Sequence, residues 1–489
     1  MGLLWVYYHG EVDIAYWEWL LGAAFVIVLY VMFAREKNMM IKENPEYRFY
    51  LWGLIAKIIG GAAFGLIYFY YYAGGDTIAY FYSAVSMSRL AMASTGDFFR
   101  VWFGPCDWEH LSLFNETIGY PFSYVYFDTR AFFLIRLITP VVAIMGHSYL
   151  LTTLALAAIS YSGVWRCYRT FVSYFPSLST QFAIAFLFMP SVVFWGSAIM
   201  KDTMTLSAAC WWVHCWDEVF FKRRRMTFNI AGLAVSMFLL IMMKPYIFMA
   251  LFPVTAIWSL FFRVSRIRSA LVKVVILPLG LAAMIGGSLY VLVSLGDSLG
   301  KFSLDKVVST VQSTQSDMVR VEAYGANRFD VGTIDGTLGN FLSKFPIATN
   351  AALFRPYLWE SRSVVMVLSA VENFWLLALT VIMLVRTQVR FFIKSMFGNP
   401  IVLMCIVFAI LFGFSIGIST PNFGALVRFK IPLVPLYVSG LYIIGYLNKQ
   451  RIKTNNAGYR FDLKLYTRGE PRSEEGSRGP SDRTKPGRA

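Results

Sequence analysis

The sequence predicts an all-α protein that crosses a membrane many times. Hydrophobic residues make up 57% of the 489 residues, charged residues make up 15%, and the mean hydropathy is +0.56. A soluble domain carries about 25% charged residues. Apolar runs of roughly 20 residues, enough to cross a hydrocarbon layer of about 30 Å, recur along the whole chain. Soluble, fibrous and disordered proteins are excluded by this composition, and a β-barrel is excluded because its strands would alternate in hydropathy.

Eleven apolar segments are long enough to be membrane spans. In chain order they cover residues 14–34, 49–72, 148–166, 180–199, 203–220, 227–243, 246–262, 270–294, 363–385, 400–418 and 431–447. A further segment, 131–146, is apolar but short and contains Arg136 and Pro140. We interpret it as a re-entrant or interfacial helix, because a crossing there would reverse the direction of every later span. A twelfth crossing is the alternative.

The basic residues predict the direction of the spans. The net charge is +16, and the lysines and arginines fall in short clusters between the apolar runs, such as 222–225. Cytoplasmic loops of membrane proteins carry this bias, so the charge indicates topology, and no nucleic-acid partner is expected. The N-terminus is predicted outside and the C-terminus inside, with the turns at Lys201-Asp202 and Lys244-Pro245 facing outward. The predicted location is the cytoplasmic (inner) membrane.

The predicted spans and loops divide the chain into five parts. These are an additional N-terminal span with a cytoplasmic loop (1–48), a transmembrane core (49–295), an extracytoplasmic loop (296–362), the C-terminal spans (363–447) and a basic, disordered cytoplasmic tail (448–489). The core contains a first extracytoplasmic loop, 74–130. Both loops are rich in aromatic residues, which suits helices that lie in the membrane interface.

Seven ionisable residues fall at the predicted outer ends of spans or in the outer loops. They are Asp76, Lys201, Asp202, Lys244, Arg355, Glu360 and Arg428. Charged groups near membrane depth are costly, which makes each one a candidate for function. A single site on the outer face is the simplest interpretation. Lys57, Arg136 and Glu372 lie inside apolar segments, and we interpret them as packed ion pairs or snorkelling side chains.

The strongest local pattern is Gly74-Gly75-Asp76, directly after the second span. Two glycines allow the chain to turn sharply out of the membrane. Asp76 then begins the next element, where it is either a helix cap or a catalytic carboxylate. Aspartate is a preferred cap residue, so position alone does not separate the two roles.

Three cations stand at the predicted outer ends of different helices. Lys201, Lys244 and Arg428 could together receive a phosphate at headgroup depth, because lysine and arginine both bind phosphate and arginine can contact two oxygens at once. The alternative is that each one anchors its helix among the lipid headgroups. Asp202, beside Lys201, is either a second carboxylate of the site or the cap of the following helix.

Taken together, these motifs resemble the GT-C superfamily of polytopic glycosyltransferases, which use sugars linked to polyprenyl phosphate. The likeness rests on the carboxylate at residue 76 after a membrane helix, the "KD" turn at 201–202, the "KPY" turn at 244–246, and "RFKIPLVPL" at 428–436. It spans residues 50–447 and is similar to bacterial O-mannosyltransferases, aminoarabinose transferases and exopolysaccharide polymerases. The resemblance implies a GT-C-like transmembrane catalytic core within 49–295.

The resemblance also implies roles for individual residues. Asp76 would be the general base that takes a proton from the acceptor hydroxyl, with Asp202 as the second choice. Lys201, Lys244 and Arg428 would hold the lipid phosphate as it leaves. The segment that carries Arg355, Tyr357, Trp359 and Glu360 would line the acceptor groove, with an aromatic ring stacked on sugar. For these aromatic residues, an anchoring role in the membrane interface is the alternative.

The predicted function is transfer of a sugar or glycan from a polyprenyl-phosphate or diphosphate carrier to an acceptor on the extracytoplasmic face. Expected partners are that carrier, membrane lipids and envelope biosynthesis proteins. No cofactor is expected, and the five scattered cysteines and four histidines indicate no metal site. At the start of its first loop the chain has a single aspartate, Asp76, where many members of that superfamily have paired acids, and it has an additional first span. Metal use and the identity of the base therefore stay open.

Two other functions fit the same pattern. One is a polysaccharide polymerase of the O-antigen type, which moves a whole chain in place of one sugar. The other is a transporter or flippase of lipid-linked sugars, which would need similar phosphate-binding cations. The lack of internal repeats and of broken helices in paired positions counts against the transporter.

Overall fold

The computed structural model describes residues 14–264, 329, 331–332, 338–361 and 364–470. Within these residues the secondary structure is helical and contains no strand. Two compact units are present, each built from several stretches of chain. Unit 1 consists of 1–166, 190–212 and 230–245, and unit 2 consists of 167–189, 213–229 and 246–489. The domain boundaries predicted near 295 and 362 lie outside the described residues.

Seven described helices are long and apolar enough to cross a membrane, and a bent pair raises the number to eight. The seven are α2 (Tyr16–Met40), a 27-residue helix (Pro45–Tyr71) that contains α3 (Tyr50–Leu66), α9 (Tyr149–Tyr174), α13 (Met226–Met243), α14 (Pro245–Val264), α20 (Val364–Thr387) and α22 (Pro400–Ser419). The bent pair is α23 (Phe423–Phe429) with α24 (Leu433–Asn456), which meet at 62°. The chain is therefore a multi-pass helical membrane protein, as predicted. The predicted number of eleven spans and their direction stay predictions.

Two predicted spans take another form. Residues 180–199 contain α10 (Ser179–Ala183), a wider helical turn (Ile184–Phe188) and α11 (Pro190–Trp195), not one continuous helix. Met189 is extended at the break (φ −62°, ψ 125°) because the proline after it disfavours the helical conformation. The segment predicted as 203–220 is mainly α12 (Lys201–Asp217), which has 17 residues and is not among the seven candidate spans. The predicted span 270–294 lies outside the described residues.

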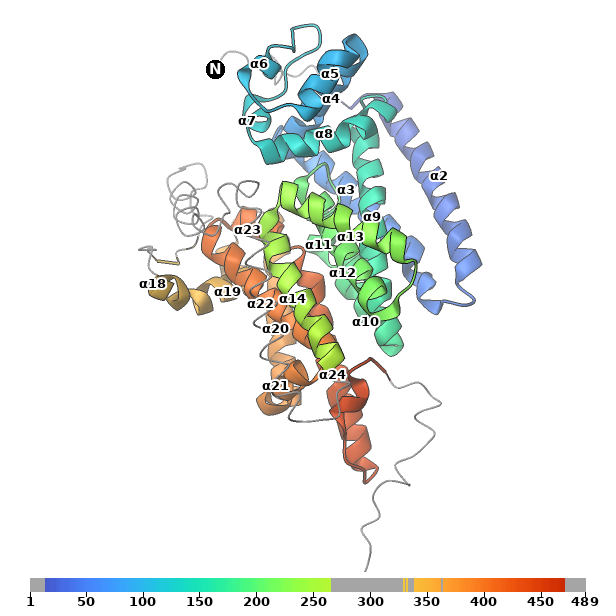
Figure 1. Ribbon diagram of the computed structural model, residues 1–489, viewed down its shortest axis with the longest axis vertical. Helices are drawn as coiled ribbons and strands as arrows, with labels where there is room; N and C mark the ends of the chain where they lie inside the picture. The colour runs from blue at the N-terminus through green and yellow to red at the C-terminus, as the bar shows by residue number, and fades with distance from the viewer. Residues whose placement is uncertain (1–13, 265–328, 330, 333–337, 362–363, 471–489) are drawn as a thin grey trace, which may run out of the picture. The chain divides into compact units, whose positions relative to one another are not determined.

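Five short or buried helices form a cap at one end of unit 1 (Figure 1). They are α4 (Asp76–Ala93), α5 (Thr95–Phe103), α6 (Trp108–Leu111), α7 (Ser123–Tyr126) and α8 (Thr129–Ile144). Side chains begin three of them: Ser94 accepts a bond from the N–H of Asp97, and Asp107 and Asp128 do the same for α6 and α8. This cap occupies most of the predicted loop 74–130 and all but two residues of the segment 131–146.

The cap contains one buried helix and two helices with exposed aromatic side chains. Most of α4 is buried, and it packs against α5, α7 and α8. Phe99 and Phe103 of α5 and Trp108 of α6 are exposed, and the interfacial position of these two helices stays a prediction. The helix α8 has 16 residues, about 24 Å at 1.5 Å per residue, which is shorter than a hydrocarbon layer of about 30 Å. Its length favours the re-entrant or interfacial interpretation of 131–146 over a twelfth crossing.

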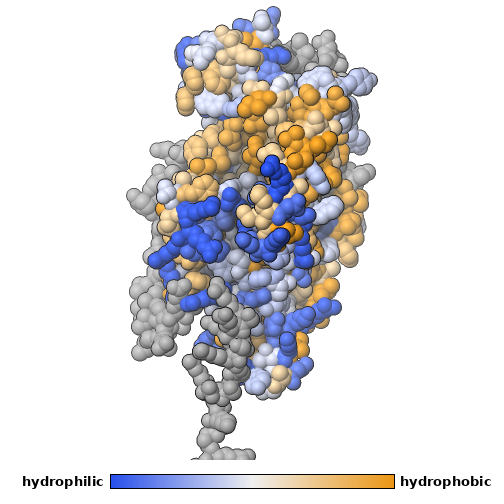
Figure 2. All heavy atoms as spheres, turned by 90° about the vertical axis from the view of Figure 1, so that its right-hand side faces the viewer, coloured by the Kyte–Doolittle hydropathy of each residue, from blue (hydrophilic) through white to orange (hydrophobic). Residues whose placement is uncertain are grey.

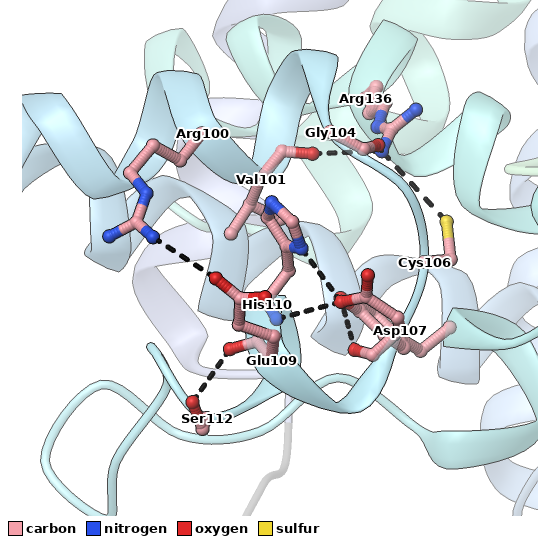
Figure 3. Close-up of polar contacts among 10 residues, drawn as sticks. Arg100, Val101, Gly104, Cys106, Asp107, Glu109, His110, Ser112 and Arg136 are labelled. Atoms are coloured by element: carbon pink, nitrogen blue, oxygen red, sulfur yellow. Dashed lines mark hydrogen bonds and ion pairs between the residues drawn. The ribbon is translucent and has the colours of Figure 1, made fainter.

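Arg136 joins α8 to the end of α5 (Figure 3). Its guanidinium Nη2 donates to the carbonyl oxygens of Val101 at 2.8 Å and Gly104 at 2.6 Å. These carbonyls lie at the C-terminal end of α5, where the helix leaves acceptors without intrahelical partners and carries partial negative charge. Arg136 therefore caps a neighbouring helix, whereas the sequence predicts a packed ion pair or a snorkelling side chain; among the described residues its bonds to oxygen go to these two carbonyls.

The surface of the described residues is strongly apolar. Figure 2 shows broad hydrophobic areas in the upper and right-hand parts of the face drawn, and hydrophilic side chains mainly in its middle and lower parts. The helix α2 contributes many of the exposed apolar residues, including Trp19, Leu20, Ile27, Val28 and Val31. Such a surface suits contact with lipid, where apolar side chains carry no penalty.

Unit 2 is built around α22, which packs against α19 (Phe345–Phe354), α21 (Val389–Gly398) and α24. Gly417 permits the closest approach, because a Cβ there would lie 2.0 Å from the carbonyl oxygen of Ala348. The predicted disordered tail 448–489 is ordered as far as Glu470. Leu463 and Tyr466 are buried, and the Asn399 side chain donates to the Tyr466 carbonyl at 2.7 Å.

Candidate functional site

The nine predicted site residues fall into two groups, one in each unit. Unit 1 holds Asp76, Lys201, Asp202 and Lys244. Unit 2 holds Arg355, Tyr357, Trp359, Glu360 and Arg428.

A strained turn delivers Asp76 to the start of α4. Ala73 has φ +47° and Gly75 has φ +96°, both in the left-handed region that favours glycine. A Cβ on Gly75 would also lie 2.9 Å from the ring of Tyr68. Asp76 is the first residue of α4 and is half-buried. Its carboxylate thus lies at the positive end of the helix dipole, where a negative charge is favourable.

Lys201 lies against the same helix. Its ammonium is 5.9 Å from the centre of the Tyr80 ring and 3.1 Å from Asp128 Oδ2. Tyr80 is four residues after Asp76 on α4, so the two side chains share one face of the helix. Asp76, Tyr80, Asp128 and Lys201 are called the acid–base patch below.

Asp128 has two roles within the acid–base patch. Its Oδ1 accepts a hydrogen bond from the N–H of Arg130 and so caps α8, and its Oδ2 accepts one from Lys201. Burial by itself would raise the pKa of this carboxyl. The Lys201 ammonium and the backbone N–H groups of Arg130 and Ala131 outweigh burial and hold the pKa of Asp128 below its usual range.

Asp202 and Lys244 form a separate buried ion pair in unit 1. The ammonium of Lys244 is 2.5 Å from Asp202 Oδ1, and the two side chains are 7% and 3% exposed. Asp202 lies in the first turn of α12, and Lys244 directly precedes α14. The pair joins the start of α12 to the end of α13. The sequence predicts both residues for the site, but it does not predict that they bind each other.

The turn before α12 presents Lys201. Thr203 Oγ1 donates to the Ala198 carbonyl at 2.7 Å, and the Met200 N–H donates to the same oxygen at 2.9 Å. Residues 197–200 are almost fully buried. Lys201, the next residue, is the first to regain exposure, so the turn directs this cation toward the cap.

In unit 2, four of the five predicted residues form one tight turn. Arg355 Nε lies 3.1 Å and 3.2 Å from the two carboxylate oxygens of Glu360, and the Tyr357 N–H donates to Glu360 at 2.8 Å. The guanidinium also lies 5.0 Å and 5.2 Å from the ring centres of Phe329 and Phe423. These contacts hold the turn in one conformation.

The turn carries a pair of stacked aromatic rings. Tyr357 and Trp359 lie with ring centres 4.9 Å apart and planes inclined by 22°, and Asn350 donates to the Tyr357 hydroxyl at 2.9 Å. Trp359 is 78% exposed. An exposed ring beside amide and hydroxyl groups can stack on a sugar and bond its hydroxyls. Arg428, at the end of α23, is half-buried with its guanidinium 5.3 Å from the Phe429 ring.

Sequence reasoning missed Asp128 and Tyr80. Asp128-Thr129 directly before an apolar helix is a recognisable cap pattern, but a cap pattern does not indicate a contact with residue 201. Within the described part of the chain, no group of three His, Cys, Asp or Glu residues is arranged to hold a metal ion.

Comparisons with known proteins return no match: no protein-family model, no curated protein and no solved structure is similar to this chain. The resemblance to GT-C glycosyltransferases therefore stays a prediction from the motifs, and the function is argued from the residues alone.

Proposed function

We propose that the protein is an integral membrane glycosyltransferase that moves a sugar or glycan from a polyprenyl-phosphate or diphosphate carrier to an envelope acceptor on the extracytoplasmic face. The observation that carries the proposal is the acid–base patch. In it, the Lys201 ammonium lies 5.9 Å from the ring centre of Tyr80, which follows Asp76 by one turn on the same face of α4.

The chemistry needs these two kinds of group. Asp76 takes the proton of the acceptor hydroxyl as its oxygen attacks the anomeric carbon, and the bond from that carbon to the carrier phosphate breaks. The phosphate leaves as an anion, so a cation must stabilise it and no acid is required. Lys201 takes this role in the proposal, since it keeps 19% of its side chain exposed while Lys244 is paired and buried.

The remaining predicted residues support the patch in other ways. The Asp202–Lys244 pair positions the start of α12, which carries Lys201. The turn with Tyr357 and Trp359 provides an exposed aromatic surface for the glycan acceptor, and Arg428 is a second candidate for the carrier phosphate. The polymerase of the O-antigen type differs only in the size of the group transferred, and the same residues serve it.

A transporter of lipid-linked sugars is the second candidate, and one finding favours it. The sequence predicts no broken helices in paired positions, but the chain breaks at Met189-Pro190 and again between α23 and α24. Broken membrane helices often mark binding sites in transporters. The two candidates differ in what Asp76 does, because transport needs no general base.

The test compares cells that lack the protein with cells that express variants at matched membrane levels. Asp76→Asn keeps the shape of the side chain and largely its capping ability but cannot take a proton. Product formation should fall by about 10²–10⁴, the usual contribution of a general base. Glu109→Gln, at an exposed carboxylate of α6, is the matched control and should be normal.

The measurements are the lipid-linked glycans and the finished envelope glycan, both by mass spectrometry, and the leaflet that holds the lipid-linked glycan, by its accessibility to an impermeant glycosidase in spheroplasts. A transferase variant accumulates its lipid-linked donor on the outer leaflet, whereas a failed transporter accumulates it on the inner leaflet. An Asp76→Asn variant with normal product would remove the chemical basis of the transferase proposal.

A further inference from the structure

Lys57 is a buried lysine whose hydrogen bonds end on backbone carbonyls. It lies in α3, within a membrane span, and its side chain is 1% exposed. Its ammonium donates to the Gly196 carbonyl, and the Val192 carbonyl lies at 3.5 Å. Among the described residues, none of its bonds goes to a carboxylate. It is therefore neither the ion pair nor the snorkelling side chain that the sequence predicts.

The two carbonyls belong to a broken helix. The helix α11 ends at Trp195. The carbonyl oxygens at this end therefore accept no hydrogen bonds from a following helical turn. Ser160 Oγ adds a donor 3.5 Å from the Gly196 oxygen. Carbonyls at such breaks form cation sites in membrane proteins, because their partially negative oxygen atoms converge on one position.

Glycines let the backbone pack closely around the Lys57 side chain. A Cβ on Gly196 would lie 3.0 Å from Lys57 Nζ and 2.5 Å from the Val192 oxygen. On α3, a Cβ on Gly60 would lie 2.2 Å from the Val193 oxygen, and one on Gly61 2.7 Å from the Ser197 oxygen. The backbone of 192–197 therefore packs in direct contact with the face of α3 that carries Gly60 and Gly61.

We propose that the carbonyl oxygens of Val192 and Gly196 form a site for an alkylammonium cation, and that Lys57 fills this site from within the chain. The cation keeps the turn at 196–200 closed, because without it the buried Gly196 carbonyl would keep only the Ser160 hydroxyl, 3.5 Å away, as a side-chain donor. The proposal concerns the fold of the turn and does not depend on the proposed function.

Chemical rescue tests the proposal in the full-length protein in detergent. Lys57→Ala removes the three terminal carbons and the nitrogen, which together correspond to n-propylammonium. Met200→Cys, introduced at a position that is 2% exposed in the turn, reports opening through its rate of reaction with a small thiol reagent. Cys405 of α22, which is fully buried in unit 2, reports global unfolding in the same sample.

Lys57→Ala should speed the labelling of Met200→Cys by about 10-fold or more, because the turn opens locally, while Cys405 stays protected. Millimolar n-propylammonium should slow the labelling again, and n-propanol, which is similar in size and uncharged, should not. Lys57→Met fills the space without the charge, so the labelling of Met200→Cys in this variant should stay fast in the presence of either additive. Gly60→Ala, which disturbs the packing of the same turn but leaves the cation, should open it without rescue.

Two results would overturn the proposal: slow labelling in Lys57→Met, or equal rescue by propanol and propylammonium. Either result would show that Lys57 keeps the turn closed by filling space and not by its charge. If Lys57→Ala exposes Cys405 as well, Lys57→Gln replaces it, since an amide can still donate to the carbonyls. The proposal then expects intermediate labelling, and labelling as slow as in the parent protein would contradict the need for a cation.

Discussion

Breaking the Asp202–Lys244 pair should destabilise the protein more than any comparable surface change. Lys244→Met keeps most of the length of the side chain and removes its charge. The Asp202 carboxylate is then left 3% exposed and without the ammonium that now lies 2.5 Å away. Asp202→Asn is the reciprocal change, and it leaves the lysine charge buried opposite a neutral amide.

The size of the effect follows from distance and burial. At the 2.5 Å separation the attraction is about 7 kcal/mol for an effective dielectric constant of about 20. Most of this offsets the loss of hydration when both ions are buried, so the intact pair adds little net stability. When one partner is removed, the other ion stays buried without its hydration and without the attraction. The free energy of unfolding of each single variant should therefore fall by about 3–5 kcal/mol. The double variant should lose less than the two single losses added together.

The assay is reversible unfolding of the purified protein in mixed detergent micelles, followed by tryptophan fluorescence. Lys201→Met is the matched control, because its pair with Asp128 has a similar bond, 3.1 Å, but side-chain exposures of 19% and 45%. A partly exposed pair contributes about 0–1 kcal/mol. The two lysine variants thus differ mainly in the burial of the carboxylate left behind.

A loss of under about 1 kcal/mol for Lys244→Met, similar to that of Lys201→Met, would refute the reasoning, since it would show that Asp202 reaches water. Strict additivity in the double variant would do so as well, because two groups in contact must be coupled.

Three further predictions follow from the cap. Arg136→Gln should destabilise the protein by about 1.5–3 kcal/mol, the range for hydrogen bonds to charged groups, measured by thermal unfolding against Arg136→Lys. In the parent protein, the lowered pKa of Asp128 adds stability above pH 3.8 that is lost as the pH falls through the folded value. In Lys201→Met, loss of the ammonium should raise the pKa of Asp128 above its value in the parent protein and so reduce this contribution to stability, and infrared titration would detect the change. Glu109→Cys should react with an impermeant thiol reagent in intact cells and Asn455→Cys should not; the reverse would invert the predicted topology.

Apolar runs alone predict most of the long helices. Residues 14–34, 49–72, 227–243 and 400–418 all lie within or close to helices of the structure, because a run of about 20 apolar residues has few other stable forms in a membrane. The break in 180–199 was harder to predict. Pro190 signals a disturbance, but hydropathy does not distinguish a kinked span from a helix that stops and restarts.

Residue types at the site could be predicted, but their partners could not. Asp128 and Lys201 are 73 residues apart, and Asp202 and Lys244 are 42 apart. A local pattern identifies a charged turn, but which carboxylate meets which ammonium depends on how the helices pack. For the same reason the sequence predicts an ion pair or a snorkelling side chain for Lys57, whereas the packing of α3 against α11 gives it backbone carbonyls.

The two buried lysines together explain why Lys201 is well placed for function. On one side of the turn at 196–200, Lys57 binds the Gly196 carbonyl, and on the other, Lys244 binds Asp202. Each contact is buried, so neither exchanges easily with water. Lys201 lies between the two fixed points and is the more exposed cation, so its position is held by the backbone on both sides. A site that must stabilise a leaving phosphate needs a cation that is accessible and preorganised, and this arrangement supplies both properties with two lysines that need not touch the substrate.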